Sequence, residues 1–344
     1  MSGGVRASSP EDAPRIAALF AEAGLHPNLG AAEMHWKYWQ ERADWPGPRS
    51  FVLARGGSLL AHAGLVPGIC AWEGARARTL HLIDWAARPD AIGAGVSLMK
   101  HLGRTVDALI AIGGSAQTLA IVGQIGFRPI GVATTYVRTL HPLGILGSTS
   151  RPRWRLVPRL LRSALWAAMA PRAQLADSQL ERIGPEELHT LTALLPKPSP
   201  GLAILERSEA LFRYLLACPI APIELYAWKR QGERRGYFLL ARPPGQARLV
   251  DCWARSVHPD DWRALVLCAV HQAAKDRDAA ELIAWGSDAP LSSALEHCGF
   301  HPRGAAPIQV LARSGATFAP SAPRVQMIDN DAAYLNEGRI ELIA

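Results

Sequence analysis

The sequence predicts an α+β protein of two tandem domains of one kind, each with a mixed, mostly antiparallel central sheet flanked by helices. The main observation is a segment that occurs twice: a strand with a central aspartate, a loop, a helix, a strand, a second helix and a Gly-Phe pair. The aspartate and the phenylalanine are 43 residues apart in the first copy (Asp84, Phe127) and 49 in the second (Asp251, Phe300). A unit of this length indicates a duplicated domain rather than a solenoid, whose repeats are shorter.

The composition suits two globular domains. Of the 344 residues, 49% are hydrophobic and 19% charged, which allows each domain its own core and excludes a disordered chain. No apolar run approaches the ~20 residues that a membrane-spanning helix needs. The first residues lack the apolar core of a signal peptide, so we expect a cytoplasmic location. The five cysteines form no Cys-x-x-Cys pair, which favours buried thiols over disulfides or a zinc site.

The first copy begins with a short strand at 5–7 and a helix that starts at Pro10, with Ser9 as a suitable N-cap. Gly56 and Gly57 separate two strand-like segments and can supply the positive φ of a hairpin turn. The elements expected after the first helix are, in order, a helix at 31–42, strands at 50–55, 58–66 and 79–87, a helix at 94–102, a strand at 108–112, a helix at 117–124 and a strand pair at 127–138.

The second copy repeats this plan after a linker. Its expected elements are helices at 185–195 and 208–217, strands at 223–229, 235–242 and 247–254, a helix at 261–275, a strand at 281–285, a helix at 291–298 and a strand at 307–313. We therefore divide the chain into an N-terminal domain (1–140), a linker (141–176), a C-terminal domain (177–318) and a tail (319–344).

The linker is strongly basic. No acidic residue lies between Asp107 and Asp177, whereas that stretch contains eight arginines. Pro158 is a good first residue for a helix that would reach Pro171. At 100° per residue, one side of this helix is apolar, with Val157, Leu160, Leu161, Ala164, Leu165 and Ala168. The other side carries Arg155, Arg159 and Arg162, and Trp154 and Trp166 flank them. This pattern is typical of an amphipathic helix lying on an anionic bilayer. The alternative is a helix packed between the two domains, with its arginines in solvent.

The loop after the aspartate-bearing strand differs between the copies. In the first copy the loop 89–95 has glycines at Gly93 and Gly95, whereas the loop after His258 in the second copy has none. The strand, this loop, the following helix and the later Gly126-Phe127 resemble the GNAT acyltransferase superfamily, whose acyl-CoA pyrophosphate loop usually reads Pro-x-x-Arg/Gln-Gly-x-Gly/Ala. The chain thus resembles a tandem GNAT protein over residues 4–140 and 178–313. It departs from the pattern at Ile92, where arginine or glutamine is usual.

The resemblance implies that the first copy binds acyl-CoA. Backbone N–H groups at a helix N-terminus form an anion pocket, and glycines let phosphates approach without a Cβ clash. A tight turn without a ligand is the alternative. The cofactor-binding residues implied in this way are Ala87, Ile92, Gly93, Ala94, Gly95, Val96, Ser115 and Gln117. The second copy, which lacks the glycines, is expected to be a scaffold or a substrate-binding half.

The chemistry that the resemblance implies is attack of an amine on the acyl-CoA thioester, which needs a base and a donor for the leaving thiolate. Asp84 is the first candidate base, although the equivalent Asp251 in the copy without glycines points to a structural role instead. His81, on the opposite face of the strand, is a second candidate, with an ordinary surface histidine as the alternative. Tyr136 is the candidate proton donor to the leaving thiolate, and the alternative is that it only packs in the core.

Two segments are candidates for binding the acceptor. His35, Trp36 and Tyr38 belong to an aromatic helix at the position that shapes the acceptor pocket in the superfamily, although core packing explains aromatic residues equally well. Asp329 and Asp331 in the tail could bind an amino group or a cation, and a solvated, Asn-capped turn is the alternative. Ligand-type residues are too sparse there to indicate a metal site.

These features favour an acyl-CoA-dependent N-acyltransferase of class EC 2.3.1. The pattern resembles tandem proteins of bacterial cell-surface polysaccharide or lipid assembly, so the expected acceptor is an amino sugar or a lipid amine. The alternative is a non-catalytic GNAT scaffold that binds acyl-CoA or an acyl carrier protein. Residues 153–170 predict contact with an anionic membrane surface or an acidic carrier protein, which would make the protein peripheral at the inner membrane. Arginines without lysines or interleaved aromatics do not favour a nucleic-acid partner.

Overall fold

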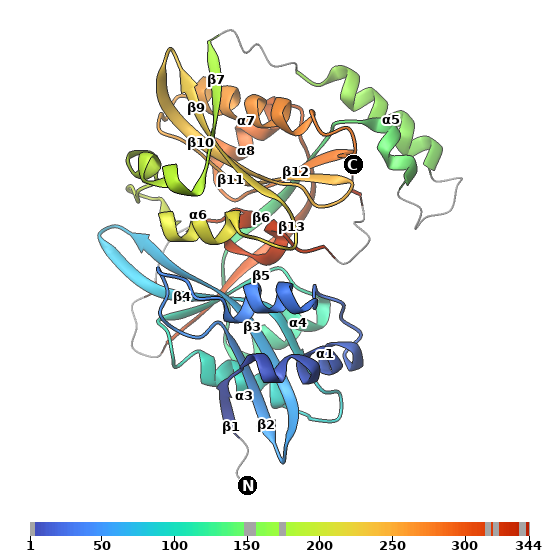
Figure 1. The fold of residues 1–344 in the computed structure, drawn as a ribbon, viewed down its shortest axis with the longest axis vertical. Helices are drawn as coiled ribbons and strands as arrows, with labels where there is room; N and C mark the ends of the chain where they lie inside the picture. Colours follow the sequence, from blue (N-terminus) through green and yellow to red (C-terminus); the bar gives the residue numbers. More distant parts are fainter. Residues whose placement is uncertain are drawn as a thin grey trace.

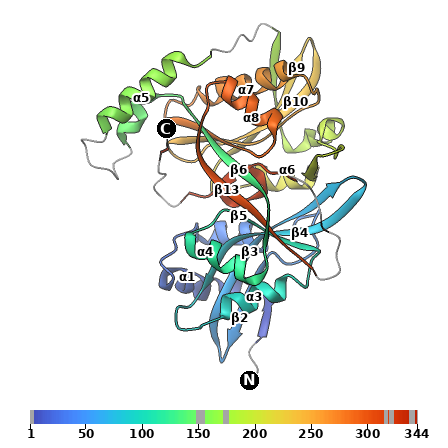
Figure 2. The same cartoon turned by 180° about the vertical axis from the view of Figure 1, so that it is seen from behind.

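The computed structural model describes residues 4–147, 156–171, 177–313, 318, 323–336 and 342–343. It consists of two halves of similar build, with the N-terminal half below and the C-terminal half above in Figure 1. Strands β6 (Arg128–Thr139) and β13 (His301–Ala312) run between the halves, as the view from behind also shows (Figure 2).

The first half contains a meander of strands followed by a strand–helix–strand–helix unit, in the predicted order. Its strands are β1 (Gly4–Ala7), β2 (Ser50–Arg55), β3 (Ser58–Trp72), β4 (Ala75–Ala87) and β5 (Ala108–Ile112). Its helices are the 3-10 turn η1 (Pro10–Asp12), α1 (Ala13–Glu22), α2 (Ala31–Met34), the π-helical turn η2 (His35–Trp39), α3 (Ala94–Leu102) and α4 (Ala116–Ile125). The predicted hairpin is confirmed, because β2 and β3 pair antiparallel around Gly56 and Gly57, which both have positive φ.

The second half repeats this order. Its strands are β7 (Ser178–Ile183), β8 (Ala203–Leu205), β9 (Ile223–Arg230), β10 (Glu233–Ala241), β11 (Gln246–Ala254), β12 (Glu281–Gly286) and β14 (Pro323–Arg324). Its helices are η5 (Pro185–Leu194), α6 (Glu209–Leu216), α7 (Pro259–Ala273), α8 (Ala289–His297) and the 3-10 turns η6 (Met327–Asp329) and η7 (Asp331–Ala333) of the tail. Ser208 and Asp288 cap α6 and α8 by accepting backbone N–H groups of the first turn.

The two halves exchange their last strands. The strand order is β1-β2-β3-β4-β5-β13-β6-β12-β11-β10-β9-β7, so one mixed sheet runs through the molecule. Strand β13 of the second half pairs with β5 of the first, β6 of the first half pairs with β12 of the second, and the two pair with each other. The predicted mixed sheet flanked by helices is therefore confirmed. The division into an N-terminal domain (1–140) and a C-terminal domain (177–318) stays a prediction. The hydrogen bonds of β6 with β12 and of β13 with β5 join the two parts.

Helices cover both faces of the sheet. In the first half α3 buries Leu98 and Met99 on one face, and α1 buries Ile16 and Phe20 on the other. In the second half α7 and α8 pack on one face, while α6 and η5 pack on the face toward the first half. The core of that inner face also includes Trp36 from the first half, so the halves share a hydrophobic core. The cysteines are free, and four of the five are buried, as the sequence indicated.

Helix α5 (Leu156–Met169) lies in the linker, preceded by the 3-10 turn η3 (Pro142–Gly147). Figure 1 and Figure 2 place it at the outer edge of the second half rather than between the halves, so the packed arrangement considered above is wrong for this helix. Trp154 and Arg155, which the linker pattern used, are outside the described residues. Within the described part of the chain no helix is both long and apolar enough to cross a membrane.

Candidate active site

A cleft opens where β4 and β5 separate. The two strands pair in parallel only from Thr79 to His81 and from Ala108 to Ile110, and β4 then continues to Ala87 without β5, still paired with β3 on its other edge. The cleft has a volume of about 380 Å³, within the range of small-molecule sites. Its lining comes from the end of α1, the end of β4, the loop before α3 and the start of α4: Ala23, Leu25, Trp85, Ala86, Ala87, Arg88, Pro89, Ala91, Ile92, Gly93, Gly95, Val96, Ser115, Thr118 and Ile121.

Gly93 and Gly95 are each required for a different structural reason. Gly93 is the N-cap of α3 and has a φ of 80°, a left-handed conformation that disfavours any residue with a Cβ. Gly95 instead lets α3 sit close to the sheet, because a Cβ there would lie 3.2 Å from Trp85 and 3.3 Å from Ala87. The N–H groups of Gly93, Gly95 and Val96 have no acceptor among the described residues, so they remain available to an anion.

The cleft brings together six of the eight predicted cofactor-binding residues: Ala87, Ile92, Gly93, Gly95, Val96 and Ser115. Ala94 is buried behind the loop, and the side chain of Gln117 is outside what the structure describes. The side chain of Ile92 is 99% exposed, so arginine at this position would not disturb packing. Sequence reasoning missed Arg88, whose guanidinium lies 2.9 Å from Asp90 at the mouth of the cleft.

Asp84 occupies a β-bulge beside the cleft. The pairing of β3 with β4 shifts between His62 and Gly64, and Asp84 itself has a φ of 45°. Its carboxylate is buried, with Oδ2 2.6 Å from Lys37 Nζ, and it accepts a hydrogen bond of 2.7 Å from the Tyr38 hydroxyl. Gly64 makes room for this group, since a Cβ there would lie 2.7 Å from the Tyr38 ring.

Lys37 is a site residue that sequence reasoning missed. The π-helical turn η2 holds one extra residue per turn, and it buries Trp36, Lys37 and Tyr38 in succession. Beyond its ion pair with Asp84, Nζ of Lys37 finds no hydrogen-bond acceptor among the described residues. Burial and the Asp84 carboxylate raise the pKa of Tyr38 well above its usual value, so its hydroxyl stays protonated and donates. The available signal is a lysine between aromatic residues, in a helix for which core packing is one of the two alternatives.

The tail brings a second carboxylate to this bulge. Turn η7 packs beside the first half, with Tyr334 edge-on to Trp36 at 4.8 Å and with Asn336 exchanging two hydrogen bonds with Asn28. Burial, followed by the neighbouring Asp84, raises the pKa of Asp331 to about 7, while Lys37 opposes this shift. The predicted acceptor residue Asp331 thus lies in the same cluster as the predicted base Asp84.

The other predicted site residues are distributed differently. His81 is buried away from the cleft, lines a separate cavity of about 180 Å³ at the junction of the halves, and has its pKa lowered to about 4 by burial. The surface-histidine alternative does not hold for this side chain. Tyr136 lies in the core of the second half and donates to Glu296. The structure therefore does not bring His81 or Tyr136 together with the residues that line the cleft.

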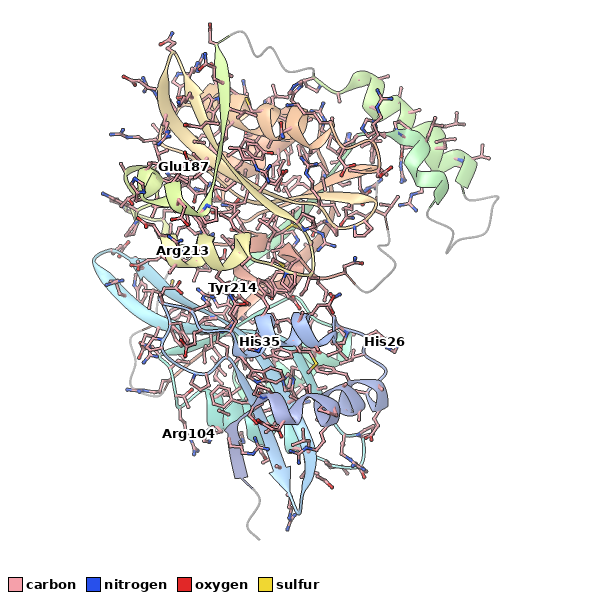
Figure 3. All side chains as sticks on the ribbon, in the orientation of Figure 1. His26, His35, Arg104, Glu187, Arg213 and Tyr214 are labelled. Carbon is pink, nitrogen blue, oxygen red and sulfur yellow. The ribbon has the colours of Figure 1, made fainter. Side chains whose placement is uncertain are left out.

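The aromatic candidates lie at the boundary between the halves. Trp36 stacks on Tyr214 of α6 with ring centroids 4.4 Å apart, and its indole N–H donates to the Tyr214 carbonyl. This placement matches the core-packing alternative for Trp36. His35 is exposed on the same turn, and Figure 3 labels both His35 and Tyr214 near that boundary. Tyr38 alone of the three touches a candidate catalytic group.

Asp329 serves the second half. Both of its oxygens accept from Arg207, which also makes a bidentate pair with Asp251 at 3.0 Å, and the Tyr237 hydroxyl donates to Asp251. All four side chains are buried. The structural role weighed for Asp251 fits this cluster. The tail therefore places one aspartate near the central aspartate of each half: Asp329 shares Arg207 with Asp251, and Asp331 lies near Asp84.

The equivalent cleft of the second half is filled by the tail. The Gln326 side chain accepts from the N–H of Cys252 and donates to its carbonyl, occupying the free edge of β11. Ser287, at the end of β12, exchanges hydrogen bonds with Val325 on the other side of the segment. Residues 323–330 are all buried. The second half therefore differs from the first in two ways: its loop has no glycine, and its own tail segment is bonded between β11 and Ser287.

No protein-family model matches the chain, and no curated protein matches its sequence. Solved structures do match over nearly the whole chain. One is a tandem GNAT protein from the clavulanic acid biosynthesis pathway (TM-score 0.54, 13% identity, covering 91% of this chain and 99% of that one). The fold is that of a tandem GNAT protein.

Two further GNAT-fold structures agree with this assignment. N-myristoyltransferase of Saccharomyces cerevisiae, solved with bound myristoyl-CoA and inhibitors, matches with a TM-score of 0.60 at 10% identity, covering 95% of this chain and 85% of that one. A GCN5-related N-acetyltransferase of Anabaena variabilis matches with a TM-score of 0.56 at 13% identity, covering 90% and 72%. At these identities the likeness concerns the fold. Among the described residues, no group of three or more His, Cys, Asp or Glu side chains could hold a metal ion.

Proposed function

We propose that this GNAT-fold protein is an acyl-CoA-dependent N-acyltransferase that binds the thioester in the cleft of its first half. The observation that carries the proposal is the pair of carboxylates, Asp84 and Asp331, at the bulge beside that cleft. A base for amine attack has to lie where the strands separate, because the thioester would emerge there. The loop before α3 supports the same assignment, since its free N–H groups and Arg88 suit a pyrophosphate.

In the proposed reaction the amine nitrogen attacks the thioester carbonyl carbon, the C–S bond breaks, and an amide and CoA are formed. An acceptor that binds as an ammonium first gives one proton to solvent and attacks as the neutral amine, and Asp331 takes the second proton, which the nitrogen loses as the amide forms. The raised pKa of Asp331 matches a base that works near neutral pH. Asp84 forms an ion pair with Lys37 and is the proposed partner for the positive charge that the amine develops. The hydroxyls of Ser115 and Thr118 line the cleft and are the donors proposed for the departing thiolate.

The acceptor that fits this cluster is a cationic amine. Asp84 and Asp331 lie near each other, with Lys37 and Arg248 as neighbouring cations, and the two carboxylates offer acceptors for the N–H groups of an ammonium. An amino sugar or a lipid amine of cell-envelope polysaccharide or lipid biosynthesis meets this requirement. A non-catalytic scaffold that binds acyl-CoA, or an acyl carrier protein docked at the basic linker, is the alternative. It predicts thioester binding without amide formation.

The Ile92→Arg variant is expected to bind acetyl-CoA about tenfold more tightly than the wild type, because an arginine can make a charge-assisted contact with the pyrophosphate. Ile92 is 99% exposed, so the change should not cost stability. Calorimetric titration with acetyl-CoA and palmitoyl-CoA measures the effect and reports the preferred chain. Val257→Arg, at a 96% exposed residue beside the second loop, is the matched control. Absence of binding to the wild type, with equal behaviour of the two variants, would contradict the cofactor site.

The rate should rise with pH and level off above pH 7. Asp331 must be deprotonated to act as a base, and its pKa is raised to about 7. With an acceptor amine that stays neutral throughout, kcat/KM at pH 6 should be about tenfold lower than at pH 8. A profile that is flat over this range would rule out Asp331 as the base.

A further inference from the structure

Helix α5 presents an apolar stripe to solvent. Val157, Leu161, Leu165 and Met169 follow each other at intervals of four residues and are 61%, 66%, 56% and 73% exposed. Ala164 and Ala168 lie on the same side and are also exposed. Large apolar side chains scattered singly on a surface are ordinary, but a continuous helical stripe marks a contact surface.

The opposite side of α5 holds the helix on the protein through polar and aromatic groups. The Trp166 ring stacks on His301 at 3.8 Å, Ser163 is fully buried, and the Arg159 guanidinium donates to the carbonyl of Leu342. The end of the helix packs on Gly299, where a Cβ would lie 3.0 Å from Ala170. The apolar side of this amphipathic helix therefore faces solvent and its polar side faces the protein. On a globular protein the apolar side usually faces the core.

Arginines border the stripe. Arg162 and Arg303 are both exposed, and each guanidinium lies over the Trp166 ring, at 5.0 and 4.5 Å from its centre. Burial and then the charges of Arg162 and Arg159 lower the pKa of Arg303, while Glu281 opposes this shift. The chain from 108 to 176 contains no acidic residue. A surface of negative charge complements the excess of arginine at this edge.

We propose that α5 docks the protein on an anionic lipid bilayer, with the stripe in the headgroup boundary and the flanking arginines on the lipid phosphates. The helix has 14 residues and lies along the surface rather than across the membrane. A second copy of the chain fits the stripe less well, because a symmetric contact between two α5 helices would bring their arginine clusters together. Docking does not depend on the proposed catalysis.

Co-sedimentation of the full chain with vesicles tests the proposal. The wild type should bind vesicles of phosphatidylglycerol and phosphatidylcholine, and should be released when the ionic strength is raised to about 1 M, where the Debye length is about 3 Å. Leu161→Glu should lower the bound fraction about tenfold, because a carboxylate at the boundary is both polar and repelled by the headgroups. Val257→Glu, an equally charged change at an exposed apolar residue of the second half, should bind like the wild type.

Three results would overturn the proposal. The first is equal binding of Leu161→Glu and the wild type with unchanged circular dichroism, which would place the contact elsewhere. The second is equal binding to pure phosphatidylcholine, which would remove the role of the arginines. The third is a wild-type dimer in light scattering that Leu161→Glu abolishes, without vesicle binding by either protein, which would assign the stripe to a protein interface.

Discussion

Replacing Asp331 by asparagine is expected to lower kcat by about 10²- to 10⁴-fold, the usual contribution of a general base. Asparagine has nearly the same shape and cannot accept the amine proton. The same change should raise the stability of the fold at pH 8. The pKa of Asp331 is raised from 3.8 to about 7 in the folded protein, so the native state loses stability as pH rises through that window. The asparagine variant keeps this stability at high pH, because its side chain does not ionise.

Activity and stability should therefore move in opposite directions, which separates a catalytic role from a structural one. Steady-state kinetics and urea unfolding at pH 5 and at about pH 8 measure the two effects. Asp260→Asn makes the same chemical change at an exposed residue of α7 and should alter neither. A kcat within twofold of the wild type would exclude Asp331 as the base.

The Arg207→Met variant is expected to lose about 3–5 kcal/mol of unfolding free energy, because it leaves the buried carboxylates Asp251 and Asp329 without their cation. The cost should grow with pH. Burial already raises the pKa of Asp329, and without Arg207, whose charge opposes this shift, Asp329 would bind a proton more readily in the folded state. Equilibrium urea unfolding at two pH values measures the loss and its pH dependence.

An exposed ion pair provides the comparison. Arg76 lies 2.6 Å from Glu206, but its side chain is 66% exposed, so Arg76→Met should change the stability little. Adding Asp251→Asn to Arg207→Met should recover part of the lost stability, since one buried charge is removed. Equal stability of Arg207→Met and Arg76→Met would contradict the role of the buried cluster.

The repeat and the loop could be predicted from sequence because they depend on local patterns. Alternating apolar residues indicate strands, and a Gly-x-Gly between a strand and a helix indicates an anion-binding turn. The structure places Gly93 and Gly95 at the cleft accordingly. Even here the reason for Gly95 differs: it lets α3 approach Trp85 and Ala87, a requirement that depends on how the helix packs.

The site beyond the loop could not be predicted in the same way. Lys37 is one charged residue in an aromatic helix, and only the π-helical turn and the bulge at Asp84 bring Nζ to the carboxylate. The sequence predicts Tyr136 as a donor in the first half, yet strand exchange places β6 against β12 of the second half. Nothing in the local pattern of a strand states which half it will complete.

The sequence by itself determined that this chain is a duplicated α+β protein with one glycine-bearing loop and a basic linker, because periodicity, turn residues and charge are properties of neighbouring residues. Tertiary structure alone decided the strand exchange, the outward stripe of α5 and the division of the tail between the halves. Asp329 and Asp331 are two positions apart, yet one joins Asp251 and the other Asp84. Their partners lie far away in the chain, and burial of charge is decided by packing between such distant segments.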